Sequence, residues 1–313
     1  IAGDLKPDIV CFSNALLAGA VRSLRQEYNG KIFCTLQGDD IFLDGLSDEH
    51  RQGAIDRISS RAADFDGFLV HSNYYRDHMA AMLRLPVEKF ARIPLGIDFS
   101  SFSPLEQPRT DNEFRIGYFA RICPEKGLHL LVKSVRRIRT QHPDVRLIAG
   151  GYLGSRDAAY FESVTKDAED LGDAFEYIGS PDNQSVKAGF LQSLDVLSVP
   201  APYKEPKGIY VLEVLACGVP VVQPAHGAYP EMLAKTQGGL LFEPGDADDL
   251  AEKLSGLIVD SAKRTELATR GNTLVRERYS LTAMTNATVS AFEAFPHNAT
   301  DVISADPARQ ETP

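Results

Sequence analysis

Short apolar runs alternate with longer helical stretches along most of the chain, and this alternation constrains the fold more than any other feature. The runs are rich in Val, Ile, Leu and Phe, as strands are when both faces of their sheet are buried. Regular strand–helix alternation predicts parallel sheets covered by helices. Ten strands are predicted, at Asp8–Phe12, Lys31–Leu36, Gly67–Val70, Phe90–Ile93, Arg115–Phe119, Arg146–Ala149, Phe175–Ile178, Val196–Val199, Pro220–Gln223 and Gly239–Phe242.

The intervals between these strands carry helical patterns. Each is long enough to cross one face of a sheet, so the fold class expected is α/β. The predicted helices are Ser13–Glu27, His50–Ala63, Tyr74–Leu83, Leu128–Gln141, Ala158–Asp170, Asn183–Ser193, Tyr210–Cys217, Tyr229–Lys235, Ala247–Asp260 and Ser280–Phe295.

A break near Pro94–Pro108 interrupts the alternation with prolines and polar residues, which indicates a linker. Four strands precede the break and six follow it. We therefore predict a partial N-terminal domain and a complete doubly wound C-terminal domain. The predicted division is 1–105 for the first domain, 106–278 for the second, 279–295 for a closing helix and 296–313 for a flexible tail.

The chain begins without Met and enters a strand pattern within ten residues. We therefore expect it to be a piece truncated at its N-terminus. It has no charged n-region or apolar core of a signal peptide. No run of 18 apolar residues occurs, so no membrane span is expected.

Composition narrows the classes of protein. The 313 residues are 43% hydrophobic and 24% charged, which is enough apolar mass for two cores and excludes dominant disorder. The formal net charge of −10 argues against general binding to nucleic acid. The four cysteines show no Cys-x-x-Cys spacing, so neither a zinc knuckle nor a thioredoxin-like motif is present. Free thiols of this kind suit a reducing compartment such as the cytoplasm.

Two cations follow the first strand of the second half. Arg121 and Lys126 bracket a tight turn that opens the helix at Leu128. In doubly wound sheets, ligands bind at the carboxyl ends of the strands. Two cations beside a helix N-terminus there predict an anion site. The alternative is an ordinary solvated Arg and Lys.

The strongest signal is a pair of glutamates with an E-x7-E spacing, Glu205 and Glu213, after the strand at Val196–Val199. Glu205 sits in a predicted loop and Glu213 within the helix that Gly208 opens. A carboxylate one turn into a helix can accept hydrogen bonds from two ribose hydroxyls, and Glu205 can reach what is attached to a phosphate. The alternative is two surface carboxylates, although the apolar neighbours of Glu213 make an unpartnered carboxylate costly there.

Backbone groups complete this predicted site. The free amides in the first turn of the same helix can donate to a phosphate. They belong to Gly208, Ile209 and Tyr210. Gly150, directly after another strand, lets a backbone approach a ligand closely, although tight turning alone explains it as well. Gly227 follows the next strand and can line the same cleft.

These residues resemble the donor domain of retaining glycosyltransferase family 4, also called glycosyltransferase group 1, which has the GT-B fold. Arg121, Lys126 and the E-x7-E pair carry the resemblance, together with Pro220-Val221-Val222 and the stretch Gly238-Gly239-Leu240-Leu241. It extends over about residues 5–295. It implies two Rossmann-like domains with doubly wound parallel sheets that face each other across a cleft, with a final helix crossing back to the first domain.

The resemblance also implies roles. Arg121 and Lys126 would neutralise the donor diphosphate, Glu205 would contact the hydroxyls of the donor sugar, and Glu213 would bind the ribose. Phosphate or sugar contacts would come from the backbone amides of Gly208, Ile209 and Tyr210. The nucleobase would lie near Tyr177-Ile178-Gly179, and Gly150 would contact the donor elsewhere. No cofactor and no metal ion are expected, because the family resembles metal-independent enzymes.

The N-terminal half departs from the family pattern. The Gly-rich loop after the family's first strand is absent, and Gln37 occupies the place of a frequent histidine. Gln37 cannot act as a base, so Asp39 or Asp40 is expected to substitute or to bind acceptor hydroxyls. Ser72 also follows a strand and would face the acceptor, although a helix cap suits it equally well.

The function expected is therefore retaining transfer of a sugar from a nucleotide-diphosphate sugar to an acceptor hydroxyl. The acceptor, which is a saccharide, a lipid-linked compound or a small molecule, is left open. So is peripheral contact with the inner face of a membrane. The alternatives are a nucleotide-sugar epimerase of GT-B fold and a truncated piece that binds sugar nucleotide without turnover. A Rossmann dehydrogenase is disfavoured because the G-x-G-x-x-G fingerprint is absent.

Overall fold

A computed structural model describes residues 5–107, 109–111 and 113–297 of the chain. The tail expected at 296–313 lies outside the described residues from position 298 onwards. No helix in the described part combines the length and the apolar character needed to cross a membrane.

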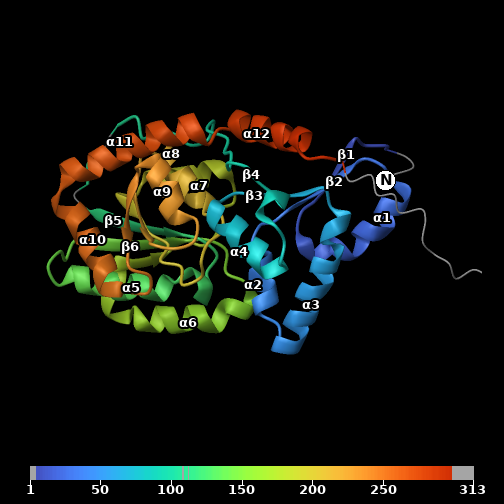
Figure 1. Ribbon diagram of the computed structural model, residues 1–313. Helices are drawn as coiled ribbons and strands as arrows, with labels where there is room; N and C mark the ends of the chain where they lie inside the picture. Colours follow the sequence, from blue (N-terminus) through green and yellow to red (C-terminus); the bar gives the residue numbers. More distant parts are fainter. Residues whose placement is uncertain (1–4, 108, 112, 298–313) are drawn as a thin grey trace, which may run out of the picture. The chain divides into compact units, whose positions relative to one another are not determined.

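The chain divides into two compact units, each built around its own parallel sheet (Figure 1). Unit 1 comprises residues 5–71, 76–93 and 288–297, and unit 2 comprises residues 72–75 and 94–287. Both units therefore have the α/β layering that the alternating pattern predicts.

The sheet of unit 1 has four parallel strands in the order β1-β2-β3-β4. Aromatic side chains fill its core. The Phe68 ring lies 5.3 Å from the Phe65 ring and 5.2 Å from the Phe90 ring, centroid to centroid. The strands are β1 (Ile9–Phe12), β2 (Lys31–Thr35), β3 (Gly67–Val70) and β4 (Phe90–Arg92), close to the four predicted ranges.

The helices of unit 1 correct two expectations. The continuous helix expected at Ser13–Glu27 is a 3-10 segment at Ala15–Ala20 followed by α1 (Val21–Glu27). The first segment is wound more tightly where Asp39 Oδ1 accepts from the Ala15 amide at 2.6 Å. A short helix that no pattern predicted, α2 (Asp39–Asp44), follows β2.

Two longer helices, α3 and α4, follow α2 along the chain. The described boundaries are α3 (Asp48–Arg61) and α4 (Asn73–Leu83), and α4 begins in residues grouped with unit 2.

The last helix, α12 (Leu281–Ala294), ends in unit 1. The Phe292 ring lies 4.7 Å from the Phe33 ring, and Lys31 Nζ donates to the Phe292 carbonyl at 2.6 Å. The end of α12 is thus fixed to β2.

The sheet of unit 2 has six parallel strands in the order β10-β9-β8-β5-β6-β7, as predicted for a doubly wound domain. The chain moves from β5 outwards to β7, then returns to place β8 on the other side of β5. The strands are β5 (Phe114–Phe119), β6 (Val145–Gly150), β7 (Phe175–Tyr177), β8 (Val196–Leu197), β9 (Val221–Pro224) and β10 (Gly239–Phe242).

Helices cover both faces of this sheet (Figure 1). Figure 1 shows α5 and α6 on one side and α8, α9 and α11 on the other. One of them, α11, was not predicted, because it is polar nearly all round and buries only Leu267, Gly271 and Val275. The helices are α5 (Leu128–Arg139), α6 (Ala158–Asp167), α7 (Gln184–Gln192), α8 (Ile209–Ala216), α9 (Tyr229–Thr236), α10 (Ala247–Val259) and α11 (Ser261–Arg278).

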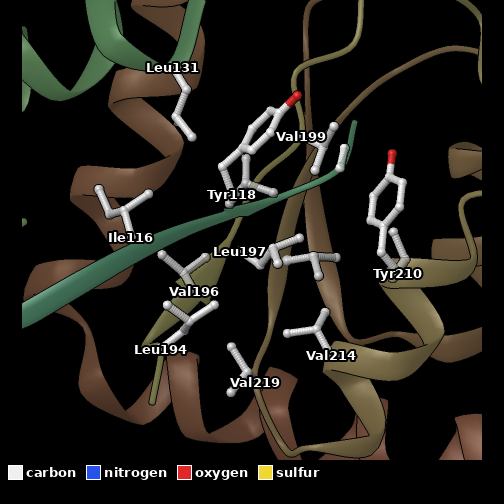
Figure 2. Close-up of a cluster of buried hydrophobic side chains, with 14 of the residues drawn as sticks. Ile116, Tyr118, Leu131, Leu194, Val196, Leu197, Val199, Tyr210, Val214 and Val219 are labelled. Atoms are coloured by element: carbon white, nitrogen blue, oxygen red, sulfur yellow. The ribbon is translucent and has the colours of Figure 1, made fainter. Parts of the chain in front are cut away.

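The core of unit 2 lies between β5, β8 and α8 (Figure 2). Ile116, Leu197 and Val214 have no solvent exposure. Figure 2 shows Tyr118 and Tyr210 with their hydroxyls at the same end of this cluster. That end is where β5 finishes, at Phe119, so the apolar core gives way to polar groups at the carboxyl edge of the sheet.

Candidate functional site

The strand order of unit 2 reverses between β5 and β8, and the two loops that follow these strands meet there. In open α/β sheets the crevice for a ligand forms at such a reversal, outside the carboxyl ends of the strands. The loop after β5 carries Arg121 and Lys126, and the loop after β8 carries Glu205. The topology therefore brings the predicted cations and one predicted acid to the same place.

Gly127 allows the two loops to approach each other. Its φ is +75°, and a Cβ at this position would lie 2.1 Å from the carbonyl oxygen of Pro200. Only glycine avoids both the left-handed strain and the collision. The turn that ends at Gly127 therefore packs its backbone directly against the start of the β8 loop.

Lys126 and Glu205 form an ion pair across this junction. The Lys126 ammonium donates to Glu205 Oε2, and the Lys207 amide donates to Glu205 Oε1 at 3.3 Å. Glu205 is only 6% exposed. Both oxygens of this buried carboxylate are thus engaged within unit 2.

The loop after β9 also contacts Glu205, through the Glu205 backbone. The Ala228 amide donates to the Glu205 carbonyl at 2.8 Å, in the loop after β9. Gly227 in that loop has a φ of +62°, and a Cβ there would lie 2.6 Å from the same carbonyl oxygen. The close approach of the β9 loop requires glycine at 227.

Arg121 lies at the start of the β5 loop, with its side chain about one-third exposed. Its Nε lies 3.2 Å from Cys123 Sγ and its guanidinium 3.8 Å from Glu125 Oε2. The structure thus places Arg121 and Lys126 on one loop but gives them different acidic neighbours. Burial raises the pKa of Glu125, but hydrogen bonds from its own backbone amide and from Cys123, together with the nearby Arg121, lower that pKa below its ordinary value, so the carboxylate is ionised near neutral pH.

Glu213 lies on α8 and pairs with a lysine that the sequence pattern did not single out. Lys187 Nζ, from α7, donates to Glu213 Oε1 at 2.6 Å, and both side chains are largely buried. Burial raises the pKa of Glu213, and the Lys187 ammonium opposes that rise. Glu213 Oε2 is buried and has no hydrogen-bond partner among the described residues.

The first turn of α8 is where the spacing predicts it. Gly208 is the N-cap, with a φ of +65°, and the helix begins at Ile209. Tyr210 is buried, and its hydroxyl hydrogen-bonds the Tyr229 hydroxyl. Burial raises the pKa of both tyrosines well above the ordinary value. The Tyr210 side chain is therefore part of the core, and only its backbone amide remains a candidate for ligand contact.

Gly150 and Ile178 lie at the ends of β6 and β7. A Cβ at Gly150 would be 3.2 Å from the Phe119 ring and 3.3 Å from Ile178, so the three residues are neighbours. Ile178 is 39% exposed. An apolar surface therefore sits at the carboxyl edge of β5, β6 and β7.

Two of the four acceptor-side candidates, Asp39 and Asp40, are buried and contact other groups of unit 1. Asp39 accepts from the amides of Ala15 and Gln37, at 2.6 and 2.8 Å, and is 2% exposed. Asp40 is equally buried and lies 3.2 Å from His78 Nε2. The structure therefore gives both aspartates a role in holding unit 1 together.

The other two acceptor-side candidates differ in exposure. Gln37 is exposed, and its side-chain amide donates to the Ser13 carbonyl at 3.2 Å. Ser72 is buried, and its hydroxyl accepts from the Tyr75 amide at 3.2 Å, which is the pattern of a cap at the start of α4.

Lys187 is the functional candidate that sequence reasoning missed. The apolar neighbours of Glu213 indicated that its carboxylate needs a polar partner, but nothing in the spacing identifies a residue on α7. Across residues 5–107, 109–111 and 113–297, no group of three or more His, Cys, Asp and Glu side chains is arranged to hold a metal ion.

The curated relatives in sequence match about two thirds of the chain. D-inositol 3-phosphate glycosyltransferase of Stackebrandtia nassauensis is 28% identical over 219 residues, which are 66% of this chain and 49% of that protein. A GDP-mannose-dependent monoacylated alpha-(1-6)-phosphatidylinositol monomannoside mannosyltransferase of Corynebacterium glutamicum is 25% identical over 66% of this chain and 57% of that protein. The chain spans about half the length of the curated relatives it matches.

Solved structures share the fold. Sucrose-phosphate synthase of Thermosynechococcus elongatus matches 93% of this chain and 74% of its own, with a TM-score of 0.80 and 20% identity. HepE of Anabaena, solved with UDP and glucose, matches 92% of this chain and 78% of its own, with a TM-score of 0.78 and 20% identity. These likenesses show that the chain has two parallel-sheet α/β domains of the GT-B fold.

A solved C-terminal domain of a related protein also matches part of this chain. The C-terminal domain of the group 1 glycosyl transferase LpcC from Francisella tularensis is matched over its whole length by 59% of this chain, with 26% identity and a TM-score of 0.55. The sequence model of the family described as "Glycosyl transferases group 1" matches residues 103–273, more than half of the chain. The chain therefore belongs to the group 1 family of glycosyl transferases.

Proposed function

We propose that this chain carries out retaining transfer of a sugar from a nucleotide-diphosphate sugar to an acceptor hydroxyl, without a metal ion. The observation that carries the proposal is the Lys126–Glu205 pair at the reversal between β5 and β8. A cation and an acid held together at this edge suit a ligand that is anionic at one end and rich in hydroxyls at the other. Family membership and the UDP and glucose bound to the neighbour HepE support this choice.

The diphosphate of the donor is assigned to Arg121 and Lys126. Departure of a nucleoside diphosphate leaves negative charge, which a divalent cation neutralises in metal-dependent enzymes. Here the guanidinium and the ammonium would supply that charge, with the first-turn amides of α8 as further donors. Each charge-assisted contact contributes about 1.5–3 kcal/mol. Since about 1.4 kcal/mol is a tenfold change in rate, each cation accounts for roughly 10- to 100-fold.

The two glutamates are assigned to the two hydroxyl-bearing parts of the donor. Glu205 lies beside Lys126 and would accept from hydroxyls of the transferred sugar. Glu213 lies one turn into α8 and would accept from the ribose, for which its buried and unpartnered Oε2 is suited. The nucleobase is assigned to the apolar surface formed by Gly150 and Ile178.

Retention requires the acceptor hydroxyl to attack from the face that the diphosphate leaves. The departing phosphate oxygens, held by Lys126, then lie close to the attacking hydroxyl and can take its proton. No carboxylate nucleophile is assigned, so no covalent intermediate is proposed. Gln37, exposed after β2, is the acceptor-side candidate for a hydroxyl contact.

Titration calorimetry with UDP, GDP and ADP tests the proposal. We expect wild-type chain to bind at least one of them, and Arg121→Ala with Lys126→Ala to weaken it by about 10²- to 10⁴-fold, from two contacts of the above size. A matched control, Arg137→Ala with Lys253→Ala, removes equal charge from more exposed positions of unit 2 and should leave affinity unchanged. Affinity that is equal in all three proteins would refute the proposal.

Turnover is tested separately by release of nucleoside diphosphate from the sugar nucleotide that binds. Release that depends on an added hydroxyl acceptor supports transfer. Epimerised sugar nucleotide formed without any acceptor would instead indicate the epimerase alternative. Binding with no release identifies a chain that holds the donor without turnover.

A further inference from the structure

Lys187 is held by three partners from different parts of unit 2. Its Nζ lies 2.6 Å from Glu213 Oε1, 5.0 Å from the centre of the Phe119 ring and 5.8 Å from that of Phe102. Ammonium groups are attracted to aromatic faces at such distances. The side chain is 19% exposed. A long lysine side chain is therefore fixed in one place, at an entropic cost that a solvated lysine does not bear.

The consequence falls on Glu213. One carboxylate oxygen is occupied by Lys187, while Oε2 is buried without a partner among the described residues. A buried carboxylate oxygen left without a hydrogen bond is costly. Because the side chain is only 7% exposed, bulk water cannot readily satisfy that oxygen. The arrangement thus leaves an acceptor position that a donor on a ligand can fill.

The ion pair with Lys187 favours the ionised form of Glu213. Burial raises the pKa of this carboxyl, and the Lys187 ammonium limits the rise. An ionised carboxylate only accepts hydrogen bonds, which suits two adjacent hydroxyl donors. A protonated carboxyl would offer a donor where the ligand also presents donors.

We infer that Lys187 is a positioning residue for ribose recognition, which fixes Oε1 of Glu213 so that Oε2 faces the vicinal hydroxyls of the nucleotide. The inference rests on the proposed function, because it requires a nucleotide at this site. Lys187 itself touches no part of the ligand. Its effect is specific to the sugar of the nucleotide and leaves the grip on the diphosphate unchanged.

The test compares ribonucleotide with deoxyribonucleotide. Affinities for UDP, GDP and their 2′-deoxy counterparts are measured by calorimetry on wild-type chain and on Lys187→Met. We expect wild type to prefer the ribonucleotide by about 10- to 100-fold, the size of one charge-assisted hydrogen bond. Lys187→Met should bind the ribonucleotide about 10-fold more weakly and reduce the ribo/deoxy preference to about 3-fold or less.

Two further variants separate positioning from a general loss of structure. Lys187→Arg keeps the charge and should restore most of the preference. In a Glu213→Gln background, Lys187→Met should have little additional effect, because the group that it positions is gone. Lys253→Met is the control, since it removes a lysine from the more exposed Lys253–Asp249 pair in the same unit.

The outcomes distinguish the inference from the proposed function. If wild type discriminates and Lys187→Met retains the full preference, the inference is wrong and the proposed function stands. If wild type binds ribo- and deoxyribonucleotides equally, the inference is likewise wrong and the proposed function stands. If wild type binds no nucleotide at all, the proposed function fails and the inference fails with it.

Discussion

Glu205 and Glu213 stand eight residues apart and each forms a buried ion pair with a lysine, yet the two pairs are built differently. Glu205 lies in a loop, and both of its carboxylate oxygens are engaged, by Lys126 and by the Lys207 amide. Glu213 lies in a helix, and only one of its oxygens is engaged, by Lys187. A shared motif spacing therefore hides two distinct local environments.

The difference shows how one motif can serve two purposes. The Lys126–Glu205 pair is closed, so a ligand must share or displace existing contacts, and the pair holds a cation in place before the ligand arrives. The Lys187–Glu213 pair is half open, so a ligand can add a hydrogen bond without displacing any. In the proposed function, the first pair serves the diphosphate and sugar, and the second serves the ribose.

The largest effect on stability is expected from Lys126→Met. This change leaves the buried Glu205 carboxylate without its charge partner, and breaking a buried pair in this way costs about 3–5 kcal/mol. Urea unfolding of the full chain measures the loss. Adding Glu205→Gln to Lys126→Met removes the unpaired charge and should recover most of the lost unfolding free energy. A double variant no more stable than Lys126→Met alone would contradict a stabilising ion pair between Lys126 and Glu205.

The next largest effect is expected from Gly227→Ala. A Cβ would collide with the Glu205 carbonyl, and a non-glycine residue in the left-handed region costs about 1–2 kcal/mol by itself. We expect a total loss of about 2–3 kcal/mol, with nucleotide affinity reduced through Glu205. The Glu213 pair should be unaffected, so ribose preference should persist.

Gly256→Ala is the matched control for this change. Gly256 lies inside α10, and a Cβ there meets no atom within 4 Å. Alanine in a helix interior is more favourable than glycine by about 0.5–1 kcal/mol, so stability should rise. Equal losses in both variants would argue against a specific contact at Gly227.

A third prediction concerns Tyr210 and Tyr229, the two buried tyrosines near Glu205. Phenylalanine at both Tyr210 and Tyr229 removes one buried hydroxyl pair and should cost about 0.5–1.5 kcal/mol at pH 7. Because burial raises the pKa of both tyrosines in the folded state, their contribution is fully present below about pH 10, the ordinary tyrosine value, and is lost as pH rises above it.

The pH dependence of unfolding checks this sign. Above about pH 10 the unfolding free energy of wild type should fall with pH more steeply than that of the double phenylalanine variant. The buried Tyr118 remains in both proteins and serves as an internal reference. Identical slopes in the two proteins would contradict the buried, neutral hydroxyl pair.

The smallest effect is expected from Lys253→Met. Its partner Asp249 lies four residues away on α10 at 3.2 Å, and the pair is more exposed to solvent than the two site pairs. Such pairs contribute about 0.3–0.5 kcal/mol. Urea unfolding should therefore barely distinguish this variant from wild type. A loss comparable to that of Lys126→Met would remove the contrast between buried and exposed pairs.

Much of the fold follows from the sequence because apolar runs report burial directly. The ten strands agree with prediction within one or two residues at most ends, and Gly208 is the N-cap of α8 as expected. The helix α11 was missed because its buried stripe is too narrow to produce a clear period. Asp39 and Asp40, after β2, were assigned to an acceptor, since a sequence does not show that backbone amides donate to Asp39 or that His78 lies beside Asp40.

The candidate site was predictable in part for a similar reason. Residues that follow strands can be placed at a sheet edge from topology alone, and this located Lys126 and Glu205. Lys187 reaches Glu213 from a neighbouring helix, and such a contact depends on tertiary packing. No spacing in the chain encodes it.

The most direct test of the account compares a nucleoside with its diphosphate on two variants. Calorimetry or competition binding measures uridine and UDP, or guanosine and GDP if wild type prefers that base, on Lys126→Met and Lys187→Met. We expect Lys126→Met to weaken binding of the diphosphate by about 10- to 100-fold and to leave nucleoside binding unchanged, whereas Lys187→Met should weaken binding of both ligands by the same factor. Equal effects of the two variants on both ligands, or no binding of either ligand to wild type, would contradict it.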